Sequence, residues 1–187
     1  MHHFWWVIQE KTLKAHSRKF YPTYLWLVTK NLSLQQEFRI AQKDDVLGEY
    51  NFLTPLYAIF HDDDKTCSFQ WTDFDDDYKI FYDSFINDSK LYADNHGMLA
   101  KKDALPPANA YTVSCMPWIS FDGFAVHSYE NKPYYFPSVE AGKFFEKDGK
   151  YMMPLSITVH HATTDGYHIN EFINALQADF DAFEKYL

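Results

Sequence analysis

Residues 141–187 of this 187-residue chain restrict the fold most strongly. The stretch AGKFFEKDGKYMMPLSITVHHA (141–162) places apolar segments on both sides of Asp148-Gly149, a dipeptide typical of a tight hairpin turn. The next segment, 168–187, predicts an amphipathic helix with one apolar stripe: Ile169, Phe172, Ile173, Leu176, Phe180 and Phe183. A hairpin followed by such a helix predicts a sheet that is covered on one face by helices.

The rest of the chain repeats these two patterns in irregular order. Helical spacing of apolar residues predicts helices over 20–34 and 77–93. Short β-rich runs predict strands over 37–42 and 110–118, a turn over 43–48, and a hairpin with an acidic tip over 55–71. We therefore expect one α/β domain over 1–187, a two-layer sandwich in which helices cover a mixed β-sheet.

The charge distribution excludes several classes of partner. The net charge is −9, and acidic residues cluster in 61–65 and 73–77. Nucleic acids and anionic membranes require concentrated Lys and Arg, so we expect neither as a partner. Neither acidic run has the spacing and central Gly of an EF-hand loop. We interpret both as solvated turns and predict no metal site.

The cysteines and the apolar runs bear on the compartment. Cys67 and Cys115 are isolated and form no CxxC motif, so neither a disulfide framework nor a zinc ribbon is indicated. No apolar run reaches the ~18 residues of a membrane span. The first ten residues lack the basic region and the cleavage site of a signal peptide. The sequence predicts a cytoplasmic protein.

The stretch VHHATTDGYH (159–168) contains the candidate chemistry. The preceding LSITV predicts a strand that runs into His160, and neighbouring side chains on a strand point to opposite faces. His160 and His161 therefore cannot readily bind one metal ion together. A histidine at a strand end, held by the following turn, suits a general base. The alternative is a buried histidine whose hydrogen bonds are satisfied by the backbone.

Several segments resemble the chloramphenicol acetyltransferase family, whose members are coenzyme A-dependent acyltransferases with an HxxxDG motif. The resemblance rests on VSCMPW (113–118) at its family distance upstream of HHATTDG (160–166), with further segments in family order: 18–28, 37–45, 57–71, 143–169 and 171–177. It implies the family fold and transfer of an acetyl group from acetyl-CoA to a hydroxyl of a small molecule. It also implies a homotrimer with active sites between subunits.

The same resemblance assigns roles to individual residues. His161 matches the base that takes the proton of the acceptor hydroxyl, and Ser114 matches the serine that stabilises the oxyanion. Asp165, followed by Gly166, matches a structural aspartate that braces the site through an arginine. His160 is then expected to point away and pack.

Family positions also suggest two binding regions. The acceptor region comprises Phe124, Val126, Ser128, Ser138 and Glu140, and the coenzyme A region comprises Trp118, Lys143 and Phe144. Glu140 occupies the place of a family threonine. A carboxylate in an apolar pocket is costly unless it is paired or neutral. Glu140 should therefore turn to solvent or meet a polar or cationic acceptor, so the acceptor is chloramphenicol or a more polar molecule.

The chain departs from the family at its N-terminus. The segment before residue 18 is shorter than the family lead-in, which supplies the arginine partner of the motif aspartate, and neither Arg18 nor Arg39 matches that position. Two alternatives stay open at this point. One is a non-catalytic ligand-binding relative of the same fold. The other is a dihydrolipoamide acyltransferase core, although no lipoyl domain or Pro/Ala-rich linker is visible.

Overall fold

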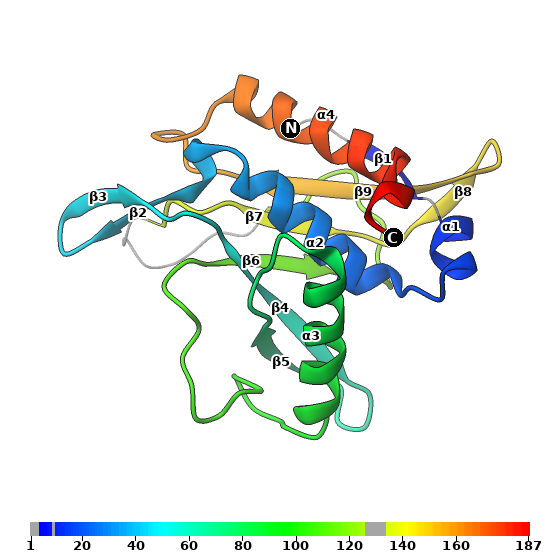
Figure 1. Cartoon of the computed structure of the whole chain (residues 1–187), viewed down its shortest axis with the longest axis horizontal. Helices are drawn as coiled ribbons and strands as arrows, with labels where there is room; N and C mark the ends of the chain where they lie inside the picture. Colours follow the sequence, from blue (N-terminus) through cyan, green and yellow to red (C-terminus); the bar gives the residue numbers. More distant parts are fainter. Residues whose placement is uncertain (1–3, 9, 126–133) are drawn as a thin grey trace.

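A mixed β-sheet is the framework of the protein (Figure 1). The computed structural model describes residues 4–8, 10–125 and 134–187. Within these ranges seven strands form one sheet in the order β1-β9-β7-β6-β4-β5, with β8 also paired to β9. Their bounds are β1 Phe4–Ile8, β4 Thr54–His61, β5 Thr66–Trp71, β6 Ala110–Cys115, β7 Ser138–Ala141, β8 Phe145–Lys147 and β9 Lys150–Thr158. β6 runs parallel to both β4 and β7, and the other pairs are antiparallel, so the predicted mixed sheet is confirmed.

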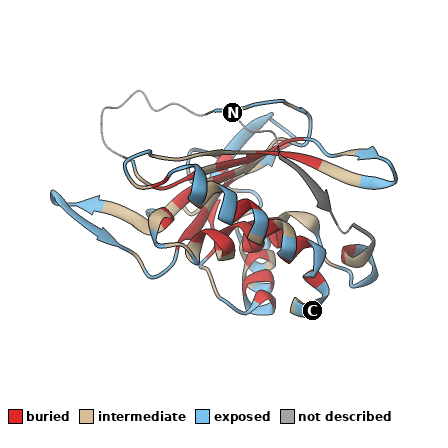
Figure 2. Ribbon diagram, turned by 90° about the horizontal axis from the view of Figure 1, so that it is seen from above, coloured by how far each residue is buried: buried red, intermediate tan, exposed pale blue. Residues whose placement is uncertain are grey.

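The helices lie on one face of this sheet. They are α1 Glu10–Ala15, α2 Phe20–Ser33, α3 Tyr78–Leu91 and α4 Gly166–Asp181, followed by a 3₁₀ turn over Phe183–Tyr186. α2 packs against both α3 and α4 and against the sheet. Figure 2 shows the buried residues concentrated where the helices meet the sheet. The predicted α/β sandwich is confirmed in this arrangement.

α2 is buried on almost every side, which explains its composition. Its consecutive apolar residues from Tyr24 to Val28 are all fully buried. A helix that is apolar all round requires neighbours on all sides. Two buried threonines are accommodated because Thr29 donates to the Leu25 carbonyl at 2.7 Å and Thr23 to the Lys19 carbonyl at 2.9 Å. These bonds satisfy the hydroxyls inside the core.

Local sequence signals fix several boundaries. The Asp77 side chain caps α3 by accepting from the amides of Lys79 and Ile80 at 2.8 and 3.2 Å. Asp148 and Gly149 have φ angles of 51° and 74°, as a two-residue hairpin turn between β8 and β9 requires. The hairpin predicted over 55–71 is β4 and β5, and the turn between them is acidic, as expected.

Four boundary predictions are wrong, and the first is the strand expected over 110–118, since β6 ends at Cys115. The strand expected over 37–42 begins at Ile40, because Gln36–Arg39 forms a 3₁₀ turn. The turn expected over 43–48 is narrower, since β3 (Val46–Glu49) pairs with β2 (Ile40–Lys43) around Asp44 and Asp45. Both of these aspartates have positive φ, so the reversal needs two residues and not six. β9 ends at Thr158, two residues before His160.

No helix among the described residues is both long and apolar enough to cross a membrane.

A buried carboxylate attaches the C-terminus to α2. Asp179 of α4 accepts from Lys30 and Asn31 at 2.8 and 3.0 Å through one oxygen. Its other oxygen accepts from Lys185 and Tyr186 at 2.8 and 2.7 Å. Desolvation raises the pKa of Asp179, but these four hydrogen bonds outweigh it and hold the pKa well below its usual range.

Replacing Asp179 should destabilise the protein at neutral pH. The substitution Asp179→Asn removes the charge-assisted bonds, and we expect the free energy of unfolding to fall by about 1–3 kcal/mol. The matched control is Asp181→Asn, because Asp181 is exposed on the same helix and bonds only to Gln177 in the described contacts. Denaturant unfolding at pH 7 measures both variants, and an equal loss in the two would contradict the account.

The same carboxylate should give a specific pH dependence. Because the folded-state pKa of Asp179 is depressed, its contribution is present above the unfolded-state pKa of about 4 and is lost as pH falls through the folded-state value. The difference in unfolding free energy between wild type and Asp179→Asn should therefore shrink as pH falls from about 5 towards 2. A difference that is constant over this range would exclude the depressed pKa.

Candidate active site

The sheet face opposite the helices carries a row of polar side chains, which we call the hydroxyl face. Its members lie on three adjacent strands and are Thr112 and Ser114 on β6, Ser138 and Glu140 on β7, and Ser156 and Thr158 on β9. The alternate residues on these strands point into the apolar core: Tyr111, Val113, Val139, Ala141 and Leu155 are buried. Strict alternation along three paired strands thus concentrates hydroxyl groups on one side.

Ser114 lies near the end of β6, beside Glu140 in the paired register. Its carbonyl accepts a 3.4 Å hydrogen bond from the hydroxyl of Tyr24, so the core helix α2 contacts the strand at this point. Among the described residues, none hydrogen-bonds to the Ser114 hydroxyl. The side chain is half-buried. Its hydroxyl can therefore donate to a substrate oxygen without breaking a bond to a described residue.

A tight loop follows Ser114 and is anchored by backbone hydrogen bonds. The Met116 amide donates to Ala141 at 2.8 Å, and the Lys143 amide donates to Ile119 at 2.7 Å. Gly142 lies between these anchors, and a Cβ on it would come within 2.8 Å of the Ile119 carbonyl and 2.7 Å of Pro154. Only glycine permits this close approach. The loop thereby fixes Trp118 relative to the end of β6.

Glu140 lies on the hydroxyl face and is buried, with 3% of its surface exposed. One carboxylate oxygen accepts from the Ser138 hydroxyl, which itself accepts from Thr112 at 2.9 Å. The other oxygen is buried and has no hydrogen-bond partner in the described part of the chain. Burial raises the pKa of Glu140, and the hydrogen bond from Ser138 offsets only part of this. The expectation that Glu140 could turn to solvent is wrong.

His161 lies in the turn that connects β9 to α4, and its side chain is exposed. Its Nδ1 atom is 3.2 Å from the carbonyl oxygen of Thr164. A carbonyl only accepts hydrogen bonds, so Nδ1 must carry the proton in this contact. In the neutral ring Nε2 then holds the free lone pair. A histidine fixed in this tautomer can accept a proton from a bound group.

The two histidines are separated by the turn, not by strand alternation. Because β9 ends at Thr158, neither His160 nor His161 lies on a strand, and the expectation of a strand running into His160 is wrong. The turn begins early because the amides of Thr163 and Thr164 both donate to the His160 carbonyl. The His160 ring packs 4.7 Å from that of Tyr135, while its Nδ1 accepts from the Ala162 amide at 3.2 Å.

Asp165 caps the first turn of α4. Its side chain accepts from the amides of Tyr167 and His168 at 2.9 and 3.4 Å, and the His168 ring bonds back to the Asp165 amide to complete a capping box. Partial desolvation raises the pKa of Asp165, but the two amide bonds and the nearby His168 outweigh it and lower the pKa. Gly166 is the first residue of the helix.

The described contacts of both candidate arginines lie elsewhere. Arg18 stacks over the rings of Tyr78 and Tyr82, at 5.6 and 4.5 Å from their centres. Arg39 donates to the Tyr50 carbonyl and lies 4.0 Å from Glu49. Among the described residues, Nδ1 of His168 lies 2.9 Å from the Asp165 carboxylate. Sequence reasoning missed His168, although an acid followed three residues later by a side chain that can bond back is a known capping pattern.

Ser114 and His161 lie far apart within one copy of the chain. The register places Ser114 level with Ser156, two strands away, and Thr158 is two residues further along β9. Ordinary strand spacing and rise then separate Ser114 from Thr158 by about 12 Å. In Figure 1 the β6 arrow points away from the turn that follows β9. One copy of the chain does not bring the two side chains together.

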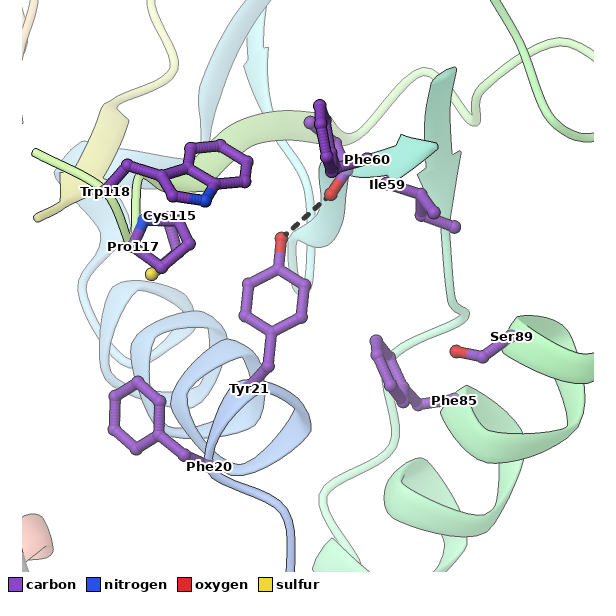
Figure 3. A pocket seen from close by; sticks show the side chains of 10 residues that line it. Phe20, Tyr21, Ile59, Phe60, Phe85, Ser89, Cys115, Pro117 and Trp118 are labelled. Carbon is purple, nitrogen blue, oxygen red and sulfur yellow. Dashed lines mark hydrogen bonds between the residues drawn. The ribbon is translucent and has the colours of Figure 1, made fainter. Parts of the chain in front are cut away.

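A cavity of about 460 Å³ opens where β4 and β6 separate. These strands pair only over Thr54–Leu56 and Ala110–Thr112, and beyond this pairing they diverge. The walls come from α2, β4, α3 and the loop after β6 (Figure 3): Phe20, Tyr21, Ala58, Ile59, Phe60, Phe85, Ser89, Cys115, Pro117 and Trp118. Tyr21 is held across it by a 3.3 Å hydrogen bond to the Ala58 carbonyl. The cavity is therefore apolar and adjoins the residue after Ser114.

Trp118, Lys143 and Phe144, the residues expected in the coenzyme A region, lie on or next to the loop that follows β6. The Trp118 ring is exposed and packs edge-on against Phe60 at 4.8 Å. The Lys143 amide bonds to the same loop, and its side chain is exposed. Phe144 is half-exposed and packs on Tyr151 at 5.9 Å. Trp118 lines the cavity, whereas Lys143 and Phe144 lie beside the loop.

The acceptor residues expected from the sequence are only partly visible. Phe124 lies over the hydroxyl face, because its carbonyl accepts from the Ser156 hydroxyl. Val126 and Ser128 lie outside the described residues. Sequence reasoning missed Thr112, Ser156 and Thr158, although a polar residue at every second position of 110–115 and 155–159 is a readable signal of a polar strand face.

The acidic tip of the β4–β5 hairpin contains one group of side chains whose atoms could coordinate a metal ion. Atoms of Asp63, Asp64 and His96 lie within 4.8 Å of one another, and both aspartates are exposed. His96 is 2.8 Å from Asp64, and Asp64 also accepts from the Thr66 hydroxyl at 2.7 Å. The hydrogen bonds from Thr66, together with His96, outweigh desolvation and lower the pKa of Asp64 to about 2. The tip is an exposed, internally hydrogen-bonded turn.

Comparison with known proteins gives the family. A family model for chloramphenicol acetyltransferase matches residues 7–177. A chloramphenicol acetyltransferase of Clostridium perfringens is 34% identical over 95% of this chain and 80% of its own length. Another, from Clostridioides difficile, is 39% identical over 88% of this chain and 77% of its own length.

Solved structures agree with the fold. A chloramphenicol acetyltransferase superimposes with a TM-score of 0.78 at 21% identity, covering 95% of this chain and 86% of its own. The dihydrolipoamide acetyltransferase of Azotobacter vinelandii superimposes with a TM-score of 0.71 at 17% identity, covering 99% of this chain and 82% of its own. At these identities the two structures support the fold class alone.

Two substitutions at Asp165 separate a helix cap from a charged brace. Asp165→Ala removes the cap acceptor, so we expect the melting temperature to fall by a few degrees. Asp165→Asn keeps an acceptor at the cap and should restore most of the loss. Thermal unfolding monitored by circular dichroism measures both. If Asp165→Asn is as unstable as Asp165→Ala, the charge of Asp165 is what the fold needs, and the cap interpretation is wrong.

Proposed function

Because this chain belongs to the chloramphenicol acetyltransferase family and is an acyltransferase, we propose that it transfers the acetyl group of acetyl-CoA to a hydroxyl of a small molecule, chloramphenicol or a more polar acceptor. The observation that carries the proposal is the His161 ring, whose Nδ1 faces the Thr164 carbonyl and whose Nε2 is left as a proton acceptor. The family relationship supports the choice of reaction. Acetyl-CoA is the second substrate.

In the proposed mechanism, Nε2 of His161 takes the proton of the acceptor hydroxyl as its oxygen attacks the thioester carbonyl. The C–O bond forms and the carbonyl π electrons move to oxygen, giving a tetrahedral oxyanion. The Ser114 hydroxyl donates a hydrogen bond to this oxyanion. Collapse breaks the C–S bond, and the proton on His161 passes to the departing thiolate. Ester and free coenzyme A are the products.

The proposal needs a second copy of the chain. Ser114 and His161 are too far apart in one copy to act on the same molecule, since a base and an oxyanion donor must both lie near 3 Å from the reacting atoms. His161 is exposed, as a group that meets a partner would be before assembly. We therefore propose a homotrimer in which His161 of one subunit faces Ser114 of the next.

The cavity between β4 and β6 supports a route for the coenzyme. It adjoins Cys115 and therefore reaches the strand end that carries Ser114. Its apolar walls suit the pantetheine arm, and the exposed Trp118 ring at the rim offers a surface on which the adenine can stack. Lys143 lies beside the same loop and can pair with phosphate. The Cys115 thiol lines the cavity in its neutral form, since burial raises its pKa to about 11.

Release of free thiol from acetyl-CoA tests the proposal. With chloramphenicol and other hydroxyl acceptors, we expect turnover in the wild type. His161→Ala should lose about 10²–10⁴-fold in kcat, and Ser114→Ala about 10²–10³-fold, because each removes one group that acts in the transition state. His160→Ala is the matched control and should keep most of the activity, since its ring packs on Tyr135.

Two outcomes contradict the proposal. The first is full activity in His161→Ala, which would remove the base. The second is wild-type protein that binds an acceptor by calorimetry but releases no thiol with any acceptor of the panel, which would identify a non-catalytic ligand-binding relative.

A further inference from the structure

Glu140 is a buried acid with an unused oxygen in the proposed acceptor region. It lies on β7, the middle strand of the hydroxyl face, with Ser114 as its register partner on one side and Ser156 on the other. With 3% of its surface exposed it is removed from water. One oxygen is engaged by Ser138, and the second is buried without a partner among the described residues.

An unpartnered carboxylate oxygen in such a place is expensive to bury. None of the ion pairs between described residues involves Glu140, although Lys and Arg are common partners of buried acids. The hydroxyls around it are already used in part, since Thr112 donates to Ser138 and Ser138 donates to Glu140. The second oxygen is therefore available to a hydrogen-bond donor of a bound ligand.

The position beside Ser114 adds a charge requirement. In the proposed reaction a negative oxygen develops at Ser114, and register partners on adjacent strands are only about 5 Å apart. An ionised Glu140 alone would repel this oxyanion. A cation bound between the two removes the repulsion and also satisfies the buried carboxylate. A neutral acetyl acceptor that offers no hydrogen-bond donor would leave the oxyanion repelled and the second Glu140 oxygen without a partner.

We propose that Glu140 binds a protonated amine of the acceptor, so that this chain acetylates an amino alcohol whose ammonium group lies two or three carbon atoms from the reacting hydroxyl. The short spacing follows from the distance between Ser114, which locates the reacting centre, and its register partner Glu140. The inference rests on the proposed function, because that function assigns Ser114 to the reacting centre. It deepens that function by naming the chemical class of the acceptor.

A matched pair of acceptors tests the proposal. Chloramphenicol and the free amine obtained by removing its dichloroacetyl group share the same nitrophenyl propanediol, but only the amine carries an ammonium group. Affinity for each is measured by calorimetry, and kcat/KM by thiol release at saturating acetyl-CoA, with the full-length assembled protein. The pH is kept below the pKa of the amine.

We expect wild-type protein to bind the amine at least ~10-fold more tightly than chloramphenicol. Glu140→Gln and Glu140→Thr should lose ~10–100-fold in affinity for the amine and none for chloramphenicol. Glu146→Gln removes the same charge from an exposed strand position and should leave both affinities unchanged. Both Glu140 variants remove a buried acid and should fold at least as stably as wild type, which thermal unfolding checks.

Three results would overturn the proposal: no binding of the amine by wild type, preference of wild type for chloramphenicol, or an equal loss for both molecules in the Glu140 variants. The calorimetric and kinetic measurements separate this inference from the proposed function. Selective binding of the amine without thiol release would support the role of Glu140 and contradict acetyl transfer. Turnover of both acceptors with no dependence on Glu140 would contradict only the role of Glu140.

Discussion

The structure depends on the alternation of side chains across β6, β7 and β9. Because successive residues on a strand point to opposite faces, these three paired strands sort apolar residues onto the side of α2 and α4 and hydroxyl groups onto the other side. A slip of one residue would exchange the two faces and expose the core. The same register that buries Val113 and Val139 therefore also places Ser114 beside Glu140.

The two faces have different roles in the account. On the core face, α2 is buried between the sheet and two helices. The hydroxyl of Tyr24, a residue of α2, donates to the Ser114 carbonyl. This contact supports the end of β6, which carries the proposed oxyanion donor Ser114. On the hydroxyl face, the segment at Phe124 covers Ser156, and Glu140 lies in the same row. Rigid support lies on one side of β6 and the proposed acceptor region on the other.

Much of the fold could be predicted from local pattern. The Asp148-Gly149 turn and the amphipathic helix carry strong local signals, and both exist, although α4 spans Gly166–Asp181 where the sequence predicts a helix over 168–187. The sequence of β7 (Ser138–Ala141) does not predict a strand, because it has only four residues and one of them is Glu140. It exists because β6 and β9 both pair with it, which is information that lies elsewhere in the chain.

In the candidate site, too, some features could be predicted from the local sequence and others depend on distant parts of the chain. The HxxxDG motif and its resemblance to a family pointed to His161 and Ser114, but no sequence pattern shows that the two residues lie apart within one copy of the chain. The strand was expected to continue into His160, yet it stops at Thr158 because the turn carbonyls and amides bond to each other. The contact of Asp165 with His168 could not be inferred either, since the resemblance implied a distant arginine as its partner.

The separation of Ser114 from His161 makes assembly the central claim. Co-expression of the two single variants, His161→Ala and Ser114→Ala, tests it most directly, because neither variant alone is expected to be active. If sites form between subunits, mixed trimers contain some sites with a native histidine and a native serine, and about a quarter of wild-type thiol release should return. Activity that stays at the level of the single variants in verified mixed trimers would contradict the account, since each site would then use both residues of one chain.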